Sequence, residues 1–368
     1  MSLRLTMLPA RQGDALWIEW GERPWRMLVD MGTQAVGTAL RRRIAALPRE
    51  QRRFELLVVT HVDEDHVGGT LPALVDEGPI DGLEFGDTWF NGWPHLQDLP
   101  VRSTLAALGP VQGERLGRWL RAYPWNAAFD KAPVAWQPGL PLRRHELADG
   151  LRLSVLGPPP TRLPAYRETW RRDVAEATAT GRLEPEPATS PSPQIQPLGV
   201  RRRPKRPALA TPDDLAALAD TVSDADPSLA NGTSIVLLLD YRGHRVLLAG
   251  DAWSDDLVAA IRAIGDGQRL SLSAFKLPHH ASESNVSRTL VEAVDCRDWL
   301  ISTDGTRHYH PGAAAVARVL RYGTPAPRLH FNVRSEFNGW WDDADWRARF
   351  GYETRYGDAT DGLALAWP

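Results

Sequence analysis

The stretch Thr60-His61-Val62-Asp63-Glu64-Asp65-His66-Val67-Gly68-Gly69 follows directly after an apolar run, Leu56-Leu57-Val58-Val59, that predicts a buried strand. Four side chains of metal-ligand type fall within six positions of this stretch: His61, Asp63, Asp65 and His66. A loop at the end of a strand can direct several side chains to one centre, and the glycine pair allows a tight turn into a following helix. A polar loop with incidental histidines is the alternative, and it explains this density poorly. The stretch therefore predicts a metal site.

Two later segments repeat this placement at the end of an expected strand. Gly250-Asp251 follows the apolar run Val246-Leu247-Leu248, and His279-His280 follows Phe275-Lys276-Leu277-Pro278. Alone, the first would be a turn and the second an ordinary polar loop. Together with the first stretch they indicate a site that holds more than one ion. Histidine and carboxylate ligands suit zinc, manganese or iron(II), and two such ions lie about 3.5–4 Å apart in dinuclear hydrolytic sites.

The composition is that of an ordinary globular protein. The 368 residues carry a formal net charge of −3, which excludes a general electrostatic attraction to nucleic acid. The single cysteine, Cys296, excludes an intrachain disulfide and leaves histidines and carboxylates as the main metal ligands. Arg4 interrupts the only apolar stretch that could open a signal peptide, and no run approaches the roughly 20 apolar residues of a membrane span. We therefore expect a soluble, cytoplasmic protein.

The apolar patterns place strands and helices in two halves. We expect strands over 3–8, 16–20, 26–30, 55–60, 83–90, 151–156, 234–241, 245–249, 274–277 and 299–302, and helices over 35–47, 71–75, 111–123, 255–264 and 313–320. Two strand-rich halves, each followed by helices, predict an α/β protein of two sheets sandwiched between helix layers, the αββα arrangement. Residues 183–230 are rich in Pro, Ser and charge, with a short helix expected near Leu215. We expect them to form a largely flexible insertion outside the core of a single domain over 1–368.

The chain resembles the metallo-β-lactamase superfamily, and within it the hydrolase domain of the ComEC-type competence proteins. The resemblance rests on the following motifs: Gln12-Gly13-Asp14-Ala15, Asp30-Met31-Gly32, the stretch from His61 to Gly69, Asp149-Gly150 to Pro158, Asn231-Gly232-Thr233-Ser234, Leu247 to Asp251, Leu277 to Ser282 and His310-Pro311. It implies two bound divalent metals, with zinc expected first and manganese as the alternative. The implied ligands are His61 and Asp63 for the first metal, Asp65, His66 and His280 for the second, and Asp251 as a bridge between them. Which of His279 and His280 binds metal is left open, with His280 expected first.

The sequence departs from the superfamily at two ligands. The superfamily usually carries histidine where Asp63 stands, and a carboxylate at that position favours manganese and other oxygen-preferring ions. The superfamily's additional histidine for the first metal has no clear match, and His95, His145 and Asn91 are the candidates.

Three further side chains have expected roles in the chemistry. Asp65, with Asp251, would orient the attacking water. His279 would protonate the leaving group, contact a substrate phosphate or lie behind a metal ligand; a buried structural histidine is the alternative. His310, which follows His308 and precedes Pro311, would either contact the substrate or serve only the entry into a helix.

These features predict a dinuclear metal-dependent hydrolase. Phosphodiester hydrolysis, with a nucleic acid as one possible substrate, is the first reading because the ComEC resemblance implies it. Hydrolysis of a small-molecule amide, lactone or thioester is the second, and a binding or scaffold module that has lost turnover is the third. The arginine cluster at 201–206 is read as a solvated basic linker in preference to a phosphate-binding element. No membrane partner is expected, and the oligomeric state is left open.

Overall fold

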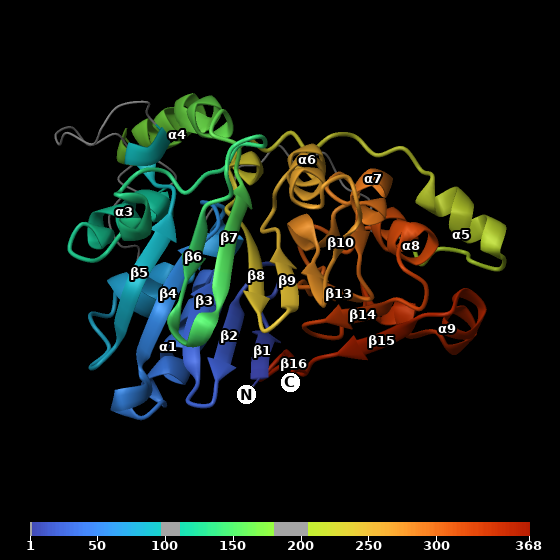
Figure 1. Cartoon of the computed structure of the whole chain (residues 1–368), viewed down its shortest axis with the longest axis horizontal. Helices are drawn as coiled ribbons and strands as arrows, with labels where there is room; N and C mark the ends of the chain where they lie inside the picture. The colour runs from blue at the N-terminus through green and yellow to red at the C-terminus, as the bar shows by residue number, and fades with distance from the viewer. Residues whose placement is uncertain (1, 97–110, 180–204) are drawn as a thin grey trace.

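The computed structural model describes residues 2–96, 111–179 and 205–368, and it contains two large sheets (Figure 1). The first has the strand order β16-β1-β2-β3-β4-β5 and the second the order β15-β14-β13-β11-β9-β8-β7-β6. Their bounds are β1 Ser2–Met7, β2 Leu16–Gly21, β3 Trp25–Val29, β4 Arg53–Val59, β5 Glu84–Phe90, β6 Arg144–Glu146, β7 Arg152–Gly157, β8 Val236–Tyr241, β9 His244–Leu248, β11 Ala274–Lys276, β13 Asp298–Ile301, β14 Arg328–Phe331, β15 Glu353–Tyr356 and β16 Leu363–Trp367. The strands β10 Leu270–Ser271 and β12 Val294–Asp295 form a small separate pair.

Helices cover the outer faces of both sheets. They are α1 Gln34–Ala45, α2 Glu64–Val67, α3 Val111–Leu120, α4 Arg162–Ala179, α5 Pro212–Ala219, α6 Ser254–Ile264, α7 Arg288–Glu292, α8 Ala313–Tyr322 and α9 Ala344–Phe350. Short helical turns are η1 Arg49–Gln51, η2 Leu71–Val75, η3 Trp93–Leu96, η4 Ala127–Phe129, η5 Ala148–Gly150, η6 Asn231–Thr233, η7 Pro278–Ala281 and η8 Gly339–Asp342. In Figure 1, α3 and α4 lie beside the first half, and α6, α7 and α8 lie beside the second.

Strand β4 shows directly that the sheets are inner layers. Its side chains alternate between two buried faces, as they must along a strand. Leu56 and Val58 belong to the core that is shared with the second sheet, whereas Leu57 and Val59 belong to the core beneath α1, α3 and α4. A strand with both faces buried reads as a continuous apolar run, which explains the sequence Leu56-Leu57-Val58-Val59. The αββα sandwich expected from the sequence is confirmed.

The two sheets place the ends of their parallel strands toward the same region. Strands β3, β4 and β5 are parallel to one another in the first sheet, and β9, β11, β13, β14 and β15 are parallel in the second. The loops that leave the carboxyl ends of parallel strands meet at one edge of a sheet, where ligands of open α/β sheets usually bind. The loops after β4, β9 and β11 therefore carry the expected ligands to one place.

The expectation that residues 183–230 lie outside the core is wrong for the part that the structure describes. Thr211 caps α5 by accepting a hydrogen bond from the backbone of Asp214, whose side chain accepts one from Thr211 in return. Leu215 and Ala219 follow at a spacing of four residues and are buried in the main core, as is Leu209. The short helix expected near Leu215 is confirmed as α5, whereas its place outside the core was expected from the proline and charge content of the segment. Residues 183–204 lie outside the described residues.

Several elements were not expected from the sequence. Helix α4 was missed because the proline run that precedes it was read as the end of the first half, although Tyr166, Trp170 and Val174 form an apolar stripe along it. The strands β14, β15 and β16 were also missed, and β16 returns the end of the chain to pair with β1.

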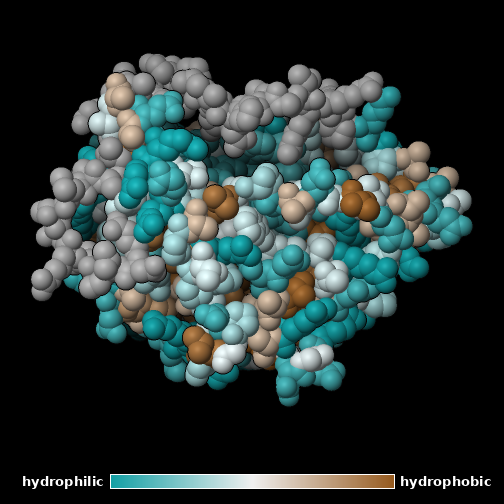
Figure 2. All heavy atoms as spheres, turned by 90° about the horizontal axis from the view of Figure 1, so that it is seen from above, coloured by the Kyte–Doolittle hydropathy of each residue, from teal (hydrophilic) through white to brown (hydrophobic). Residues whose placement is uncertain are grey.

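No helix in the described ranges is long and apolar enough to cross a bilayer. On the face seen from above, the described surface is mainly hydrophilic, with hydrophobic residues scattered among the polar ones (Figure 2).

Candidate metal centre

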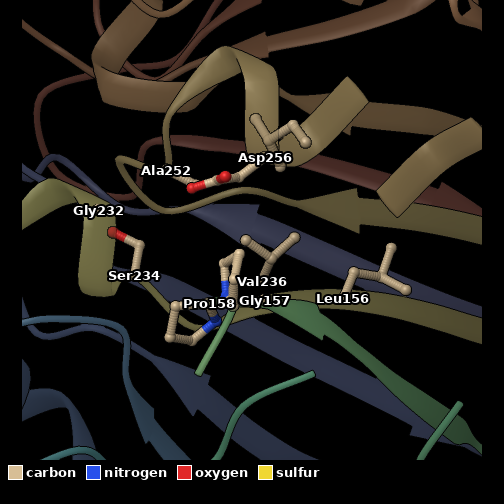
Figure 3. Close-up of a pocket in the computed structure, with 10 residues that line it drawn as sticks. Leu156, Gly157, Pro158, Gly232, Ser234, Val236, Ala252 and Asp256 are labelled. Carbon is tan, nitrogen blue, oxygen red and sulfur yellow. The ribbon is translucent and has the colours of Figure 1, made fainter. Parts of the chain in front are cut away.

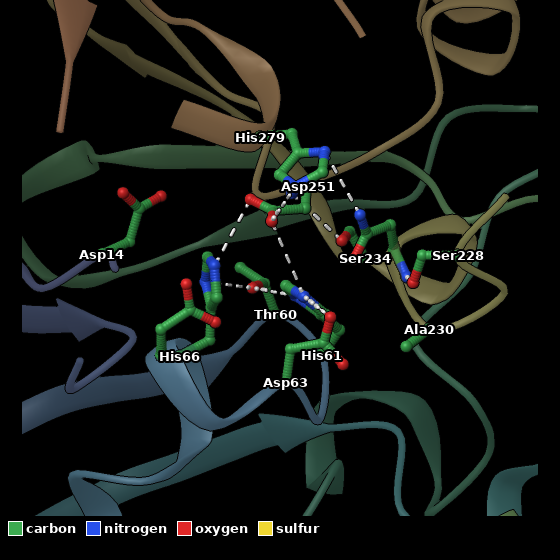
Figure 4. Close-up of polar contacts among 12 residues, drawn as sticks. Asp14, Thr60, His61, Asp63, His66, Ser228, Ala230, Ser234, Asp251 and His279 are labelled. Atoms are coloured by element: carbon green, nitrogen blue, oxygen red, sulfur yellow. Dashed lines mark hydrogen bonds and ion pairs between the residues drawn. The ribbon is translucent and has the colours of Figure 1, made fainter. Parts of the chain in front are cut away.

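Three loops bring the expected ligands together (Figure 4). His61 lies two residues after the end of β4, Asp251 three residues after β9, and the pair His279-His280 within η7, which follows β11. Asp251 lies between the histidines, and the histidine rings face it. Gly69, three residues after His66, is required by close packing. A Cβ at this position would lie 2.0 Å from the carbonyl oxygen of Met31, so only glycine allows the two segments to approach.

His66 is held by a carboxylate on the side away from the centre. Its Nδ1 lies 2.8 Å from Oδ2 of Asp30, and Asp30 is itself fixed because it accepts hydrogen bonds of 2.7 Å from both the backbone N–H and the hydroxyl of Thr60. With Nδ1 bearing the proton, Nε2 of His66 presents a lone pair. That nitrogen lies 3.3 Å from Oδ1 of Asp251 and 3.3 Å from Nε2 of His280.

His280 is oriented in the same way from the opposite side. Its Nδ1 donates to the backbone carbonyl of Ser302 at 2.8 Å, which leaves Nε2 free. Nε2 of His280 lies 3.5 Å from Oδ2 of Asp65 and 3.6 Å from Oδ2 of Asp251. Partners of this kind on the outer nitrogen are typical of metal-binding histidines.

Two buried polar atoms in this cluster lack a hydrogen bond. Among the described residues, Nε2 of His61 and Oδ1 of Asp251 have no hydrogen-bond partner. Buried polar atoms without a partner are rare because desolvation is costly. Nε2 of His61 lies 3.6 Å from Oδ2 of Asp63 and 3.9 Å from Oδ2 of Asp251. Asp63 is more open than the others, with 38 % of its side chain exposed.

The spacing of these atoms fits metal ligands better than hydrogen bonds. Nitrogen and oxygen ligands lie about 2.0–2.2 Å from a zinc ion, so two ligands of a tetrahedral ion lie about 3.4 Å apart. The separations of 3.3–3.9 Å around Asp251 are longer than good hydrogen bonds and close to this value. The donor set of imidazoles and carboxylates is the one that divalent transition metals take. The residues present therefore fit divalent ions.

The electrostatics also favour a cation at this place. Burial alone would raise the pKa of Asp251, but His66, His280 and His279 lower it, and its pKa lies well below the usual range. Burial lowers the pKa of His280, but the nearby carboxylates of Asp251 and Asp14 outweigh this effect and raise the pKa to about 10. The pKa of His66 is likewise raised, because Asp251 and Asp30 outweigh its burial. The buried carboxylates favour protonation of the neighbouring histidines. The same negative charge would favour a bound metal ion, which would replace the protons on the histidine nitrogens.

Asp14 was not expected as part of this site. Asp14, His66, Asp251 and His280 each offer one atom of a group within 4.8 Å of one another, the one such group of possible metal ligands among the described residues. Nevertheless, Oδ2 of Asp14 pairs with the buried Lys276 at 2.7 Å, and its Oδ1 lies 3.4 Å from Nδ1 of His280, the outer nitrogen. We therefore place Asp14 behind His280. The sequence offered a signal for it in the motif Gln12-Gly13-Asp14-Ala15, without a role.

The three candidates for an additional ligand of the first metal have other partners. The side chain of Asn91 is used on both sides by the backbone of Val134. His95 is buried beside Asn126, and burial lowers its pKa to about 4. His145 lies on β6 with its ring against Trp89. None of the three belongs to the group of possible metal ligands found in the described residues, and neither do His61, Asp63 and Asp65, so of the six expected ligands the group contains His66, Asp251 and His280. The additional ligand stays a prediction.

His279 and His310 lie at the edge of the centre. Nε2 of His279 is 3.9 Å from Oδ2 of Asp251, and 25 % of its side chain is exposed. The His310 ring packs against His279 with centroids 5.2 Å apart, and the His308 ring lies 6.1 Å from that of His310. His279, His280 and Ala281 all have positive φ, 47°, 53° and 62°. Such strained backbone is frequent at functional sites.

A small pocket lies beside the Asp251 loop (Figure 3). Its lining includes Pro158, Gly232, Ser234 and Ala252 and is mainly apolar, and it contains none of the histidines or ligand carboxylates named above. Ser234 links the two places, since its hydroxyl accepts a hydrogen bond of 3.1 Å from the backbone N–H of Asp251. The pocket therefore lies beside the Asp251 loop and is separate from the candidate metal centre.

No protein-family model matches this chain, and no curated protein matches it either. Among solved structures, it is similar to the metallo-beta-lactamase fold protein YhfI from Bacillus subtilis. That similarity covers 100% of both chains at 8% sequence identity, with a TM-score of 0.37.

Proposed function

We propose that this protein is a metal-dependent hydrolase of the metallo-β-lactamase superfamily with a dinuclear centre. One observation carries the proposal: the Nε2 atoms of His61, His66 and His280 lie 3.3–3.9 Å from the carboxylate of Asp251, while their Nδ1 atoms contact partners on the other side. In a purely structural cluster, these histidine nitrogens and carboxylate oxygens would form hydrogen bonds with one another or with solvent-exposed groups. Here it leaves Nε2 of His61 and Oδ1 of Asp251 buried and unbonded.

The residues divide into two ligand groups around Asp251. His61 and Asp63 would hold the first ion, and Asp65, His66 and His280 the second, with Asp251 between them. Ions held there would lower the pKa of water and neutralise the negative charge that develops on the substrate during hydrolysis. Asp65 and Asp251 would orient the attacking water, because an oxygen of each carboxylate lies 3.5 Å and 3.6 Å, respectively, from Nε2 of His280. A scaffold module without turnover has less support, since these ligand-type side chains converge on a single carboxylate.

We further propose that the substrate is a phosphodiester, as the ComEC resemblance implies. Two side chains next to the centre, His310 and Arg307, support the proposal that the substrate is anionic. The His310 ring lies beside those of His279 and His280, and the exposed Arg307 lies 3.8 Å from Glu64 in the first loop. Zinc is the expected metal and manganese the alternative, since Asp63 adds an oxygen ligand to the first group.

The test is a metal-analysed preparation assayed side by side on a simple phosphodiester, a single-stranded nucleic acid, a β-lactam, a lactone and a thioester. We expect two divalent ions per chain and turnover of the phosphodiester that chelation removes and added metal restores. Turnover of the lactone or thioester alone would reject the phosphodiesterase proposal and keep the hydrolase. Failure to bind metal after reconstitution with zinc or manganese would reject the dinuclear centre.

A further inference from the structure

The first ligand group has fewer protein ligands than the second. Counted with the shared Asp251, His61 and Asp63 give the first group three ligands, whereas Asp65, His66 and His280 give the second group four. Three is the number usual at a catalytic zinc site, and a fourth ligand would make the two groups equal. His279 is the remaining histidine whose Nε2 faces Asp251. Its Nε2 lies 3.9 Å from Oδ2 of Asp251, the same distance at which Nε2 of His61 lies from that oxygen.

The tautomer of His279 is set by a chain of amide and carboxylate contacts. Nδ2 of Asn285 donates to Oδ2 of Asp226 at 2.8 Å and is 3.2 Å from the carbonyl of Asp251. This fixes the direction of the Asn285 amide, so that its Oδ1 faces Nδ1 of His279 at 2.8 Å. Nδ1 carries the proton in this arrangement, because Oδ1 of Asn285 can only accept and is the nearer contact; Nδ2 of Asn231 lies farther away, at 3.3 Å. Nε2 consequently presents a lone pair on the side of Asp251.

Asp226 anchors this chain of contacts. Only 5 % of its side chain is exposed, and its Oδ2 lies 3.5 Å from Nδ1 of His279. It also accepts hydrogen bonds from the side chain of Asn231 at 2.8 Å and from the backbone N–H of Ser228 at 2.9 Å. These contacts hold the carboxylate in place from three directions. A carboxylate behind a histidine is the arrangement that orients metal-binding imidazoles and makes them stronger ligands.

We infer that His279 is a ligand of the first metal and that Asp226, together with Asn285, is the positioning group that directs it there. The inference rests on the proposed dinuclear centre and goes further, because it gives the segment before β8 a role in metal binding. That segment carries Asp226 and had been expected to lie outside the core. His279 then does not act as the acid that protonates the leaving group.

Metal binding tests this inference without any assay of turnover. Metal-free protein is titrated with zinc alone, followed by calorimetry, and with cobalt(II) alone, followed by its visible absorption. The wild-type protein should bind two ions. His279→Gln should keep one ion at unchanged affinity and bind the other at least about 100-fold more weakly, and Asp226→Asn should weaken that same ion about 10–100-fold.

Two matched variants separate local from general effects. Asp224→Asn changes an exposed carboxylate two residues from Asp226, and His244→Gln changes a histidine at the start of β9. Both should bind two ions as the wild-type protein does. Circular dichroism of each metal-free variant checks the fold. If His279→Gln does not fold, Asp226→Asn still reports on the same ion.

The outcomes for the inference and for the proposed function are distinct. Two ions of wild-type affinity in folded His279→Gln, or an equal weakening of both ions, would overturn the assignment of His279 to the first metal and leave the hydrolase proposal standing. Two ions in the wild-type protein without hydrolysis of any substrate would overturn the hydrolase proposal, and the variants would still decide the role of His279. A wild-type protein that binds no second ion would overturn both.

Discussion

The two sides of the candidate centre are built differently. On the near side, the loop after β4 supplies four potential ligands within six positions, from His61 to His66. On the far side, Asp251 and His280 come from two separate loops, and Asp226, behind His279, comes from a third. Both sides use the same device to aim an imidazole, since Asp30 stands behind His66 as Asp226 stands behind His279. A contiguous motif is thus visible in the sequence, whereas the groups that aim its side chains come from elsewhere.

The ligand carboxylates of the two sides also differ in exposure. Asp63 on the near side has 38 % of its side chain exposed, whereas Asp251 on the far side has 3 % exposed. A buried carboxylate that faces four histidines has a strong electrostatic reason to bind cations, while an exposed one is screened by water. The far side should therefore dominate metal binding, and the near side should determine which metal is preferred and how the substrate enters. The following predictions test that division.

The largest expected effect is on catalysis when the shared carboxylate is removed. Asp251→Ala should lower the phosphodiesterase rate by about a thousandfold or more, equivalent to about 4 kcal/mol in the barrier. His66→Ala should cause a similar loss, because it removes a ligand of the second ion. Steady-state kinetics measures the loss, and circular dichroism should show an intact fold, since Asp251 lies on a loop and His66 on the four-residue helix α2, and both follow apolar strands. Near wild-type rates in both folded variants would refute the dinuclear mechanism.

The sequence predicted the sandwich and most of its strands because their apolar patterns are local. It also predicted the convergence of His66, Asp251 and His280, because each follows a strand and parallel strands end at one edge. It could not predict Asp14, Asp226 or Asp30 as the groups behind the histidines. Those contacts depend on pairs of residues 36 to 266 positions apart in the chain. Nothing in their local pattern distinguishes them from turn residues.

The second effect tests the ion pair buried behind the far side. The side chain of Lys276 is fully buried, and its Nζ pairs with Asp14 at 2.7 Å. Lys276→Met would leave the Asp14 carboxylate buried without its partner, and we expect metal-free protein to lose about 3–5 kcal/mol of unfolding free energy. Urea denaturation measures it. The double variant Asp14→Leu/Lys276→Met should recover much of that loss, and an unchanged deficit in the double variant would contradict the explanation.

The third effect tests whether the segment before β8 belongs to the core. Leu215 on α5 is 4 % exposed and lies in the main core, and Arg318 on α8 donates to the backbone carbonyls of Ala219 and Thr221. Leu215→Ala should cost about 2–5 kcal/mol of unfolding free energy, the range for a buried leucine. Urea denaturation measures it, with the exposed Val222→Ala as the control. A loss no larger than that of the control would show that α5 packs only loosely.

The smallest effect compares the two aiming carboxylates directly. Asp30→Asn replaces the carboxylate behind His66 by a neutral amide. The hydrogen bond from Nδ1 of His66 becomes weaker, and the ring is held less firmly in its orientation. Metal affinity should fall about 10–100-fold, as is usual when such a partner is removed. The affected ion should be the second, which His66 binds, whereas Asp226→Asn should affect the first. Cobalt(II) titration of the two variants and of their combination separates the ions, because independent sites give additive losses. If both variants weakened the same ion, the division of the histidines between a first and a second ion would have to be redrawn around Asp251 alone.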